Sequence, residues 1–83
     1  MSRLDKWLFH ARFCRTRSLA QAAAAAGRVR LNGRRIDKPA QTIKPGDILT
    51  LGRGAQVMAV RILALAERRG STSEAQKLYE IVE

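Results

Sequence analysis

Apolar residues near the start of the chain recur with the spacing of a helix. The positions i, i+3, i+4 and i+7 are occupied by Leu4, Trp7, Leu8 and Ala11. This spacing brings the four side chains onto one face, so it predicts a helix that packs on a core through that face. The charged side chains of the same segment are expected on another side of the helix.

A second helix is predicted over the five alanines at 22–26, because alanine has the highest helix propensity. Its start has two candidate caps, which are Thr16 alone or Ser18 paired with Gln21 in a capping box. Gly27 stands where a helix commonly ends in a left-handed residue. We expect this helix to pack through a thin stripe made of Leu19, Ala22, Ala23 and Ala26.

The following segment predicts a β-hairpin. Its turn is Asn32-Gly33, the strongest short-range signal for a two-residue hairpin loop, between two short alternating segments. The implied register pairs Val29 with Ile36, Arg30 with Arg35 and Leu31 with Arg34. Val29 and Ile36 then enter the core. Two arginines stand opposite each other on the outer face, where like charges destabilise the pair.

Two further strands are predicted after the hairpin. The type II turn that precedes them is Lys44-Pro45-Gly46-Asp47, with Pro and Gly at the positions that this turn favours. Strands at 48–51 and 56–63 follow, and a turn at 52–54 joins them. The second is expected to be the final strand, with one face formed by Met58, Val60 and Ile62.

The tail predicts a third, short helix. Ser71 and Glu74 are spaced as a capping box, and an apolar stripe follows at Ala75, Leu78, Tyr79 and Val82. Two helices, a small and mostly antiparallel sheet, and a short C-terminal helix indicate an α+β fold. A chain of 83 residues is long enough for a single domain, here 1–83, with its core at 3–51 and a strand and helix at 55–83.

The charge of the chain is strongly positive and unevenly distributed. The sequence has 16 Lys and Arg, 7 Asp and Glu, and a net charge of +9. Residues 1–35 carry nine of the bases and one acid, whereas 64–83 carry three bases and four acids. An excess confined to one part of the chain favours a polyanionic partner. The excess includes Arg12, Arg15 and Arg17, a cluster without a nearby acid in the sequence.

A phosphate backbone would supply the counter-charge that this cluster lacks. Arg15, Thr16 and Arg17 are predicted at the start of the second helix, where free N–H groups and the helix dipole favour phosphate. If the hairpin packs beside that helix start, its arginines converge with this cluster.

The residue types needed for most catalytic and metal sites are scarce. His10 is the only histidine and Cys14 the only cysteine, which are too few for a zinc site or a catalytic triad. We expect both to be surface or packing residues, and we expect no enzyme activity, metal or cofactor. The single cysteine, an N-terminus unlike a signal peptide and the absence of a long apolar run predict a cytoplasmic protein that does not bind membranes.

Four motifs, in this order, resemble the S-four RNA-binding domain. This fold is named after small-subunit ribosomal protein four and is also called the αL motif. The motifs are RLDKWL, RTRSLAQA, GRVRLNG and KPGDILTL, and they cover about residues 3–51. The tail, AERRGSTSEAQKLYE, is similar to one bacterial subfamily, the ribosome-associated heat shock protein fifteen group.

The resemblance implies that RNA binds in a basic groove formed by the two N-terminal helices and the adjoining hairpin. The motif positions imply contacts from Arg3, Lys6, Arg15, Thr16, Arg17, Ser18, Gln21, Arg28, Arg30 and Asn32. The charge clusters add Arg12, Arg34 and Arg35. Asp5 is expected to orient a neighbouring arginine rather than to contact RNA.

The resemblance also implies a role on stalled large ribosomal subunits that carry peptidyl-tRNA, with structured rRNA or tRNA as partner. We expect a monomer in the absence of RNA. Longer members continue with a Lys/Arg-rich extension, so two explanations stay open for a chain that stops at Glu83: ribosome binding is weaker, or the sequence is a shortened form of a longer protein.

Two other classes of function remain open. One is an accessory RNA-binding module of a pseudouridine synthase or an rRNA methyltransferase. The other is binding to DNA or an anionic membrane. It is disfavoured because the second helix is rich in alanine where base-reading side chains should be, and no basic helix has a large apolar face to insert.

Overall fold

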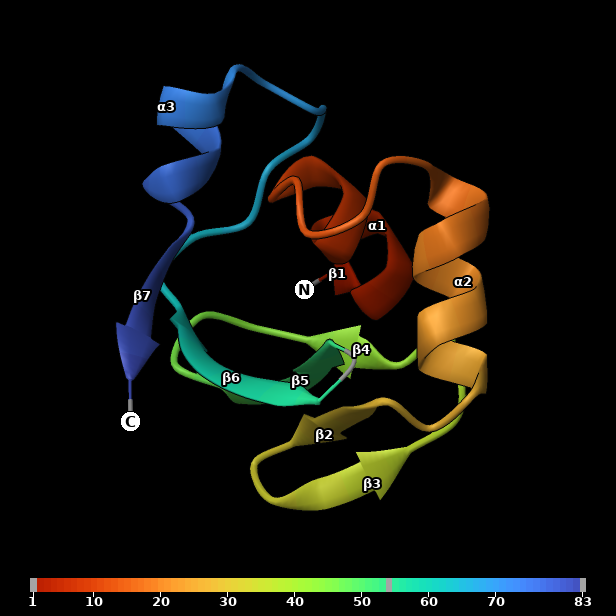
Figure 1. Cartoon of the computed structure of the whole chain (residues 1–83). Helices are drawn as coiled ribbons and strands as arrows, with labels where there is room; N and C mark the ends of the chain where they lie inside the picture. Colours follow the sequence, from red (N-terminus) through yellow and green to blue (C-terminus); the bar gives the residue numbers. More distant parts are fainter. Residues whose placement is uncertain (1, 54, 83) are drawn as a thin grey trace.

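A five-stranded antiparallel sheet forms the base of the molecule (Figure 1). The computed structural model describes residues 2–53 and 55–82. The strand order of the sheet is β3-β2-β5-β6-β7, and the strands are β2 (Val29–Leu31), β3 (Arg34–Ile36), β5 (Ile48–Arg53), β6 (Gln56–Ile62) and β7 (Tyr79–Val82). A separate antiparallel pair is made by β1 (Ser2–Arg3) and β4 (Thr42–Ile43).

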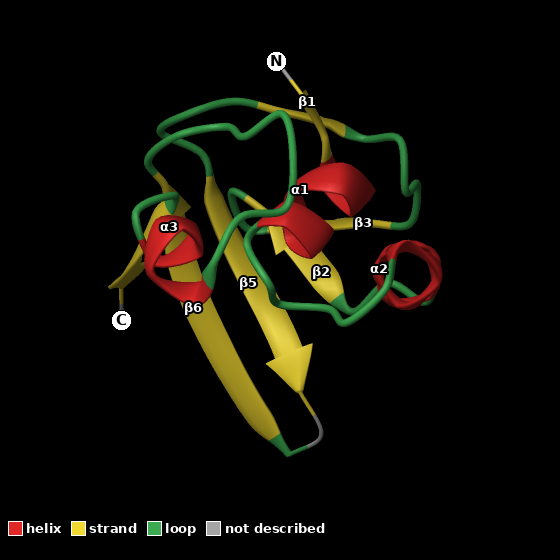
Figure 2. Ribbon diagram, turned by 90° about the horizontal axis from the view of Figure 1, so that it is seen from above, coloured by secondary structure: helices red, strands yellow, loops and turns green. Residues whose placement is uncertain are grey.

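The helices lie on one side of this sheet. They are α1 (Leu4–His10), α2 (Arg17–Ala25) and α3 (Thr72–Gln76). Seen from above, α1 lies over the sheet, α2 lies next to the edge that contains β2 and β3, and α3 lies over the end that contains β6 (Figure 2). The segment 63–71 leaves β6 and passes α1 before it reaches α3 (Figure 1). This arrangement confirms the predicted α+β fold class.

The first helix packs as its apolar spacing predicts. Exposed fractions of 3% or less are found for Leu4, Trp7, Leu8 and Ala11. The Trp7 ring packs against those of Phe13 and Tyr79, with centroid distances of 5.7 and 6.4 Å. Its Nε1–H also donates to the carbonyl of Ala64 at 3.0 Å, so the buried indole has its polar atom satisfied. Trp7 therefore joins the first helix to the C-terminal third of the chain.

Thr16 is the cap of α2, because its Oγ1 accepts a hydrogen bond from the Leu19 N–H at 3.0 Å. Gly27 has φ +72°, the left-handed conformation expected after a helix end. The predicted packing stripe of α2 is wrong in part. The fully buried residues are Ala20 and Ala24, whereas Leu19 is 52% exposed, Ala22 and Ala26 are exposed, and Ala23 is half-buried. The helix is rotated about its axis relative to the prediction.

The hairpin and the turn before β5 have the predicted conformations. The register pairs Val29 with Ile36 and Arg30 with Arg35. Both turn residues are left-handed, with φ values of 50° at position 32 and 84° at position 33, as a type I′ turn requires. Gly46 has φ +95°, and the Asp47 N–H donates to the Lys44 carbonyl at 3.2 Å. These features confirm a type II turn.

The C-terminal part differs from the prediction in two places. Gly52 and Arg53 belong to β5, so the expected turn at 52–54 begins later, and residue 54 lies outside the described residues. Ser71 caps α3 through the Glu74 N–H as expected, but the helix ends at Gln76. The residues Tyr79–Val82 form β7, so β6 is not the final strand.

The apolar stripe predicted for the third helix fits a strand as well. In β7, Tyr79 pairs with Ile62, and its ring contacts Phe13 at a centroid distance of 4.6 Å. Pairing with β6 satisfies the backbone hydrogen bonds along an edge that an extended helix would have left open. The strand is favoured for this reason over a longer helix.

We expect the substitution Trp7→Ala to lower the free energy of unfolding by about 3–5 kcal/mol, because it removes a fully buried ring at the contact between α1 and the C-terminal segment. Urea denaturation followed by circular dichroism measures the change. The control is Val57→Ala, since Val57 is 73% exposed and its truncation should change stability by less than about 0.5 kcal/mol. Equal losses in the two variants would contradict this account of the core.

Candidate nucleic-acid interface

The carboxylate of Asp5 connects the first two helices. Asp5 lies on α1 and is completely buried. Its oxygens accept hydrogen bonds from the Arg3 guanidinium at 2.9 and 3.1 Å and from the Lys6 N–H at 2.8 Å. From α2, Gln21 Nε2 donates at 3.4 Å, and the Arg17 guanidinium lies at 3.5 Å. Three of the predicted RNA-binding side chains, Arg3 of β1 and Arg17 and Gln21 of α2, therefore meet at one anion on α1.

Asp5 remains ionised at neutral pH. Burial by itself raises the pKa of its carboxyl, but hydrogen bonds from Arg3, the Lys6 N–H and Gln21 outweigh burial and bring the pKa below its ordinary value of 3.8. The expectation that Asp5 orients a neighbouring arginine agrees with this geometry. The carboxylate holds Arg3 through two bonds, which fixes the plane of that guanidinium.

The same contacts explain the rotation of α2. Arg17 and Gln21 are spaced i, i+4, so they lie on one face of the helix, and both point toward Asp5. This face also includes the buried Ala20 and Ala24. Leu19 is two residues from Arg17, which is about 200° around the helix, and so it faces away from α1.

A groove lies beside these contacts. It has a volume of 570 Å³ and is formed by α1, the start of α2 and the segment after β6, with a lining of Ser2, Lys6, His10, Arg17, Leu65, Ala66 and Glu67. Lys6 is exposed and Arg17 is 42% exposed. The Nε of Arg17 is buried and has no hydrogen-bond partner among the described residues. The groove is thus lined by the cationic side chains of Lys6 and Arg17 and by one acid, Glu67.

The segment 63–70 is bound to α1 and to the residues just after it through side chain to backbone contacts. Besides the Trp7 bond to Ala64, His10 Nδ1 lies 3.0 Å from the Ala66 carbonyl oxygen, which agrees with a packing role for this histidine. Arg12 Nε donates to the Gly70 carbonyl at 2.8 Å. Arg12 also has φ +65°, a left-handed backbone conformation. This residue therefore has a structural role in addition to its positive charge at the surface.

Arg68 and Arg69 belong to the basic region, and the sequence analysis missed them. Arg69 donates to the Phe9 carbonyl at 3.2 Å and lies 4.9 Å from the centre of the Phe9 ring. Arg68 is 79% exposed and lies 3.9 Å from Glu74. The signal was available, since both arginines are part of the tail motif AERRG. It was overlooked because the tail as a whole has a slight negative charge.

The cluster at 12–17 has a protein counter-charge, which corrects the expectation that only a partner supplies one. Arg17 pairs with Asp5, an acid twelve residues earlier in the chain. Arg15 is exposed and makes no hydrogen bond or ion pair with the residues that the structure describes. Ser18 is exposed beside it. Arg15 is therefore the cation of this cluster that is available to a partner.

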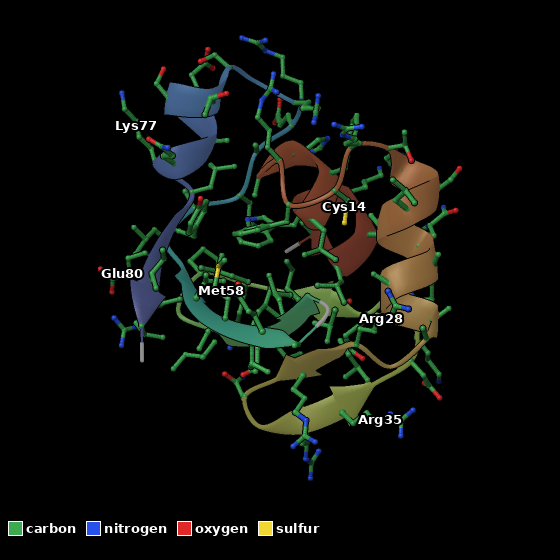
Figure 3. All side chains as sticks on the ribbon, viewed as in Figure 1. Cys14, Arg28, Arg35, Met58, Lys77 and Glu80 are labelled. Carbon is green, nitrogen blue, oxygen red and sulfur yellow. The ribbon has the colours of Figure 1, made fainter. Side chains whose placement is uncertain are left out.

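The hairpin lies at the end of α2, so the expected convergence of the two arginine clusters at its start is wrong. Figure 3 shows Arg28 and Arg35 near the lower end of this helix. Because α2 has nine residues, the two clusters are separated by about 13 Å along its axis. The guanidinium of Arg35 lies over Gly27 and leaves no room for a Cβ there.

Asn32 uses its side-chain amide within the fold. Its Nδ2 donates to Asp47 at 3.1 Å, and its Oδ1 accepts from the Ile48 N–H at 2.8 Å. Asn32 therefore fixes the hairpin against β5, a role that its place among the predicted contacts did not reveal. Besides Asn32 itself, the exposed side chains of the hairpin are Arg30, Arg34 and Arg35.

Asp47 is the second buried carboxylate. Burial raises the pKa of Asp47, but hydrogen bonds from Lys44 and Asn32 outweigh it, and the pKa lies below its ordinary value.

The side of the molecule formed by α3 and β7 carries both a base and an acid. Figure 3 places Lys77 at the end of α3 and Glu80 on β7, across the molecule from Arg28 and Arg35. Cys14 lies between α1 and α2, where it is half-buried and packs against the core as expected. Within residues 2–53 and 55–82, no helix has the length and apolarity to cross a membrane, and no three metal-ligand side chains gather.

The chain is similar to known proteins over nearly its whole length. The model of the S4 domain family, the S-four family named above, matches residues 2–49. A heat shock protein 15 homolog of Aeromonas salmonicida is 43% identical over 98% of this chain and 61% of its own length. An RQC P-site tRNA stabilizing factor of Bacillus subtilis is 35% identical over 96% of this chain and 91% of that protein.

A solved structure of Vibrio cholerae heat shock protein 15, described as trimeric, has a TM-score of 0.90. It is 40% identical and covers 96% of this chain and 80% of that one. The chain spans about three fifths of the length of the curated heat shock protein 15 relatives.

We expect Asp5→Asn to lower the free energy of unfolding at pH 7 by about 1–3 kcal/mol, because charge-assisted bonds to Arg3 and Arg17 are lost. The pKa of Asp5 is lowered in the folded state, so its contribution is full above pH 3.8 and is lost as the pH falls through the lowered value. The difference between the variant and the parent should therefore shrink in acid.

Denaturation curves at several pH values measure this difference. The matched control is Asp37→Asn, which changes an exposed aspartate and should alter stability by less than about 0.5 kcal/mol. A gap that stays constant from pH 7 down to strong acid would show that the charge of Asp5 is not what stabilises the fold.

Proposed function

Because the chain belongs to the S4 domain family, we propose that it binds structured RNA, either ribosomal RNA or tRNA, through the basic surface of α1, α2 and the hairpin. The family match over residues 2–49 and the relatives confirm the resemblance seen in the four motifs. The observation that carries the proposal is the buried Asp5 carboxylate, which lies on α1 and holds Arg3 of β1 and Arg17 of α2 in one basic surface.

Fixed cations bind a phosphate backbone at a lower entropic cost. The guanidinium of Arg3 is held by two bonds to Asp5, and Arg17 is held beside it. Side chains that are ordered before binding lose less conformational freedom when the partner arrives. Arg15 and Ser18 add donors at the start of α2, where the helix dipole favours anions.

The surface has two basic ends, which favours a folded RNA over an isolated phosphate. One end is the region around Asp5, and the other is the hairpin with Arg28, Arg30 and Arg34. About 13 Å of α2 lies between them, and its outward residues are mostly small, so a backbone can approach closely. An RNA helix or a compact loop spans both ends and presents its phosphates and 2′-hydroxyls to them.

A finer role is also part of the proposal, and the names of the relatives support it. We propose that the chain acts without catalysis on stalled large ribosomal subunits that carry peptidyl-tRNA. Support comes from its similarity to heat shock protein 15 and to an RQC P-site tRNA stabilizing factor. A monomer in the absence of RNA remains our prediction, and the trimeric description of the Vibrio structure makes sedimentation of the free protein the direct check.

We expect structured RNA to bind more tightly than duplex DNA of equal length at physiological salt. The reason is that the surface lacks a helix with base-reading side chains for a DNA major groove, while fixed cations suit an A-form backbone. Competition in fluorescence anisotropy compares the two, and the affinity for RNA should fall as salt rises. DNA that competes as well as RNA would refute the assignment.

We expect Arg15→Ala to weaken RNA binding by about 1.5–3 kcal/mol, since one charge-assisted phosphate bond is lost. Stability should not change, because Arg15 is exposed and pairs with no described residue. The slope of log affinity against log salt should decrease by about one.

Lys77→Ala is the matched control, because it removes the same charge from the opposite side of the molecule (Figure 3). Its RNA affinity should stay close to that of the parent. If both variants bind equally weakly, net charge and not the surface around α2 determines binding.

A further inference from the structure

The groove beside Asp5 combines two kinds of lining. Lys6 and Arg17, from α1 and α2, bring positive charge to it, and Leu65 and Ala66, from the segment after β6, bring apolar surface. Its volume of 570 Å³ lies within the range of about 300–1,000 Å³ that is typical of small-ligand sites. A double helix is too wide to enter such a hollow, whereas one nucleotide fits it.

Lys6 and Arg17 both have hydrogen-bond donors that are not used by the described residues. Arg17 uses one terminal nitrogen on Asp5, while its Nε is buried and lacks a hydrogen-bond partner among the described residues. Buried donors without partners cost free energy and are uncommon in folded proteins. Lys6 is exposed, and its ammonium group forms no ion pair within the part of the chain that the structure describes. A phosphate in the groove would give an acceptor to the Lys6 ammonium group and to the exposed part of the Arg17 guanidinium.

We propose that this groove holds a single unpaired nucleotide of the bound RNA. Its phosphate lies against Lys6 and Arg17, and its base lies against the apolar surface of Leu65 and Ala66. The inference rests on the proposed function and makes it more specific. Proteins that distinguish RNA sites do so mainly at unpaired nucleotides, whose bases are free of the stack and can enter a pocket. The preferred substrate is thus an RNA helix with a bulge, not a continuous duplex.

The segment that carries the apolar lining is firmly placed. Trp7 and His10 of α1 bind the carbonyl groups of Ala64 and Ala66 on either side of Leu65. A wall held at two points by a neighbouring helix keeps its shape when the groove is empty. Such a preformed wall lowers the entropic cost of seating the base.

Three ligands test the inference with the parent protein. They are a paired RNA hairpin, the same hairpin with one unpaired adenosine, and free adenosine monophosphate. The bulged hairpin should bind about tenfold more tightly than the paired one, which is the effect of one additional charge-assisted bond. The free nucleotide, which lacks the contacts with the rest of the surface, should not displace the bulged hairpin at equal concentration.

Three other results would each contradict a different part of the proposal. Equal affinity for the two hairpins would overturn the pocket and leave RNA binding intact. Displacement by the free nucleotide at equal concentration would overturn RNA as the source of the ligand. Failure of both hairpins to bind would overturn the proposed function itself.

A fluorescent base gives a second readout that needs no variant. With 2-aminopurine as the unpaired nucleotide, its emission should change when protein is added, and 2-aminopurine in a paired position should respond less. An identical response at the two positions would contradict entry of the base into the groove.

A filling substitution then locates the site. In Ala66→Trp the affinity ratio between bulged and paired hairpins should fall from about ten to near one, because the indole occupies the groove. Ala55→Trp, in the exposed turn before β6, is the matched control and should keep the ratio of the parent. A ratio that survives in Ala66→Trp, with thermal melting confirming that the variant is folded, would overturn the location.

Discussion

The basic surface depends on one buried negative charge. A carboxylate without partners would be expensive to bury, and Asp5 is tolerated because Arg3, Arg17, Gln21 and the Lys6 N–H surround it. These bonds determine more than the ionisation of Asp5. They set the distance between α1 and α2 and the rotation of α2, and they hold two guanidinium groups at the surface.

A second buried carboxylate has the same structural role at the hairpin. Asp47 accepts from the Asn32 side chain and from Lys44, so it fixes the hairpin turn against the turn before β5. Asp5 and Asp47 are the only buried charged residues within the described part of the chain. Each lies beneath one end of the proposed RNA surface. The acids are therefore internal supports for the basic surface and not competitors for its cations, since each is shielded from a bound phosphate.

The sequence was informative wherever a structure is determined by neighbours in the chain. The Thr16 cap, the Asn32-Gly33 turn and the register of the hairpin depend on residues a few positions apart. The turn and the register were predicted correctly, and Thr16 was one of the two candidate caps. The rotation of α2 could not be predicted from the sequence, because alanine covers most of the helix. The residue that determines the rotation, Asp5, lies on another element. The end of α3 was missed for a similar reason. The residues after it fit a helix or a strand, and only the open edge of β6 favours the strand.

The same limitation applies to charge. Counting by segments assigned the positive field to 1–35 and left the tail near neutral, but the fold redistributes these charges. Two of the four tail acids are engaged, since Glu74 lies near Arg68 and Glu80 pairs with Arg61. The segment 63–70 is bound to α1, which brings Arg69 against Phe9. The field that an RNA would meet under the proposed function thus includes the tail arginines, and it depends on which acids find partners inside the protein. A partner's phosphates respond to this field rather than to the order of charges in the chain.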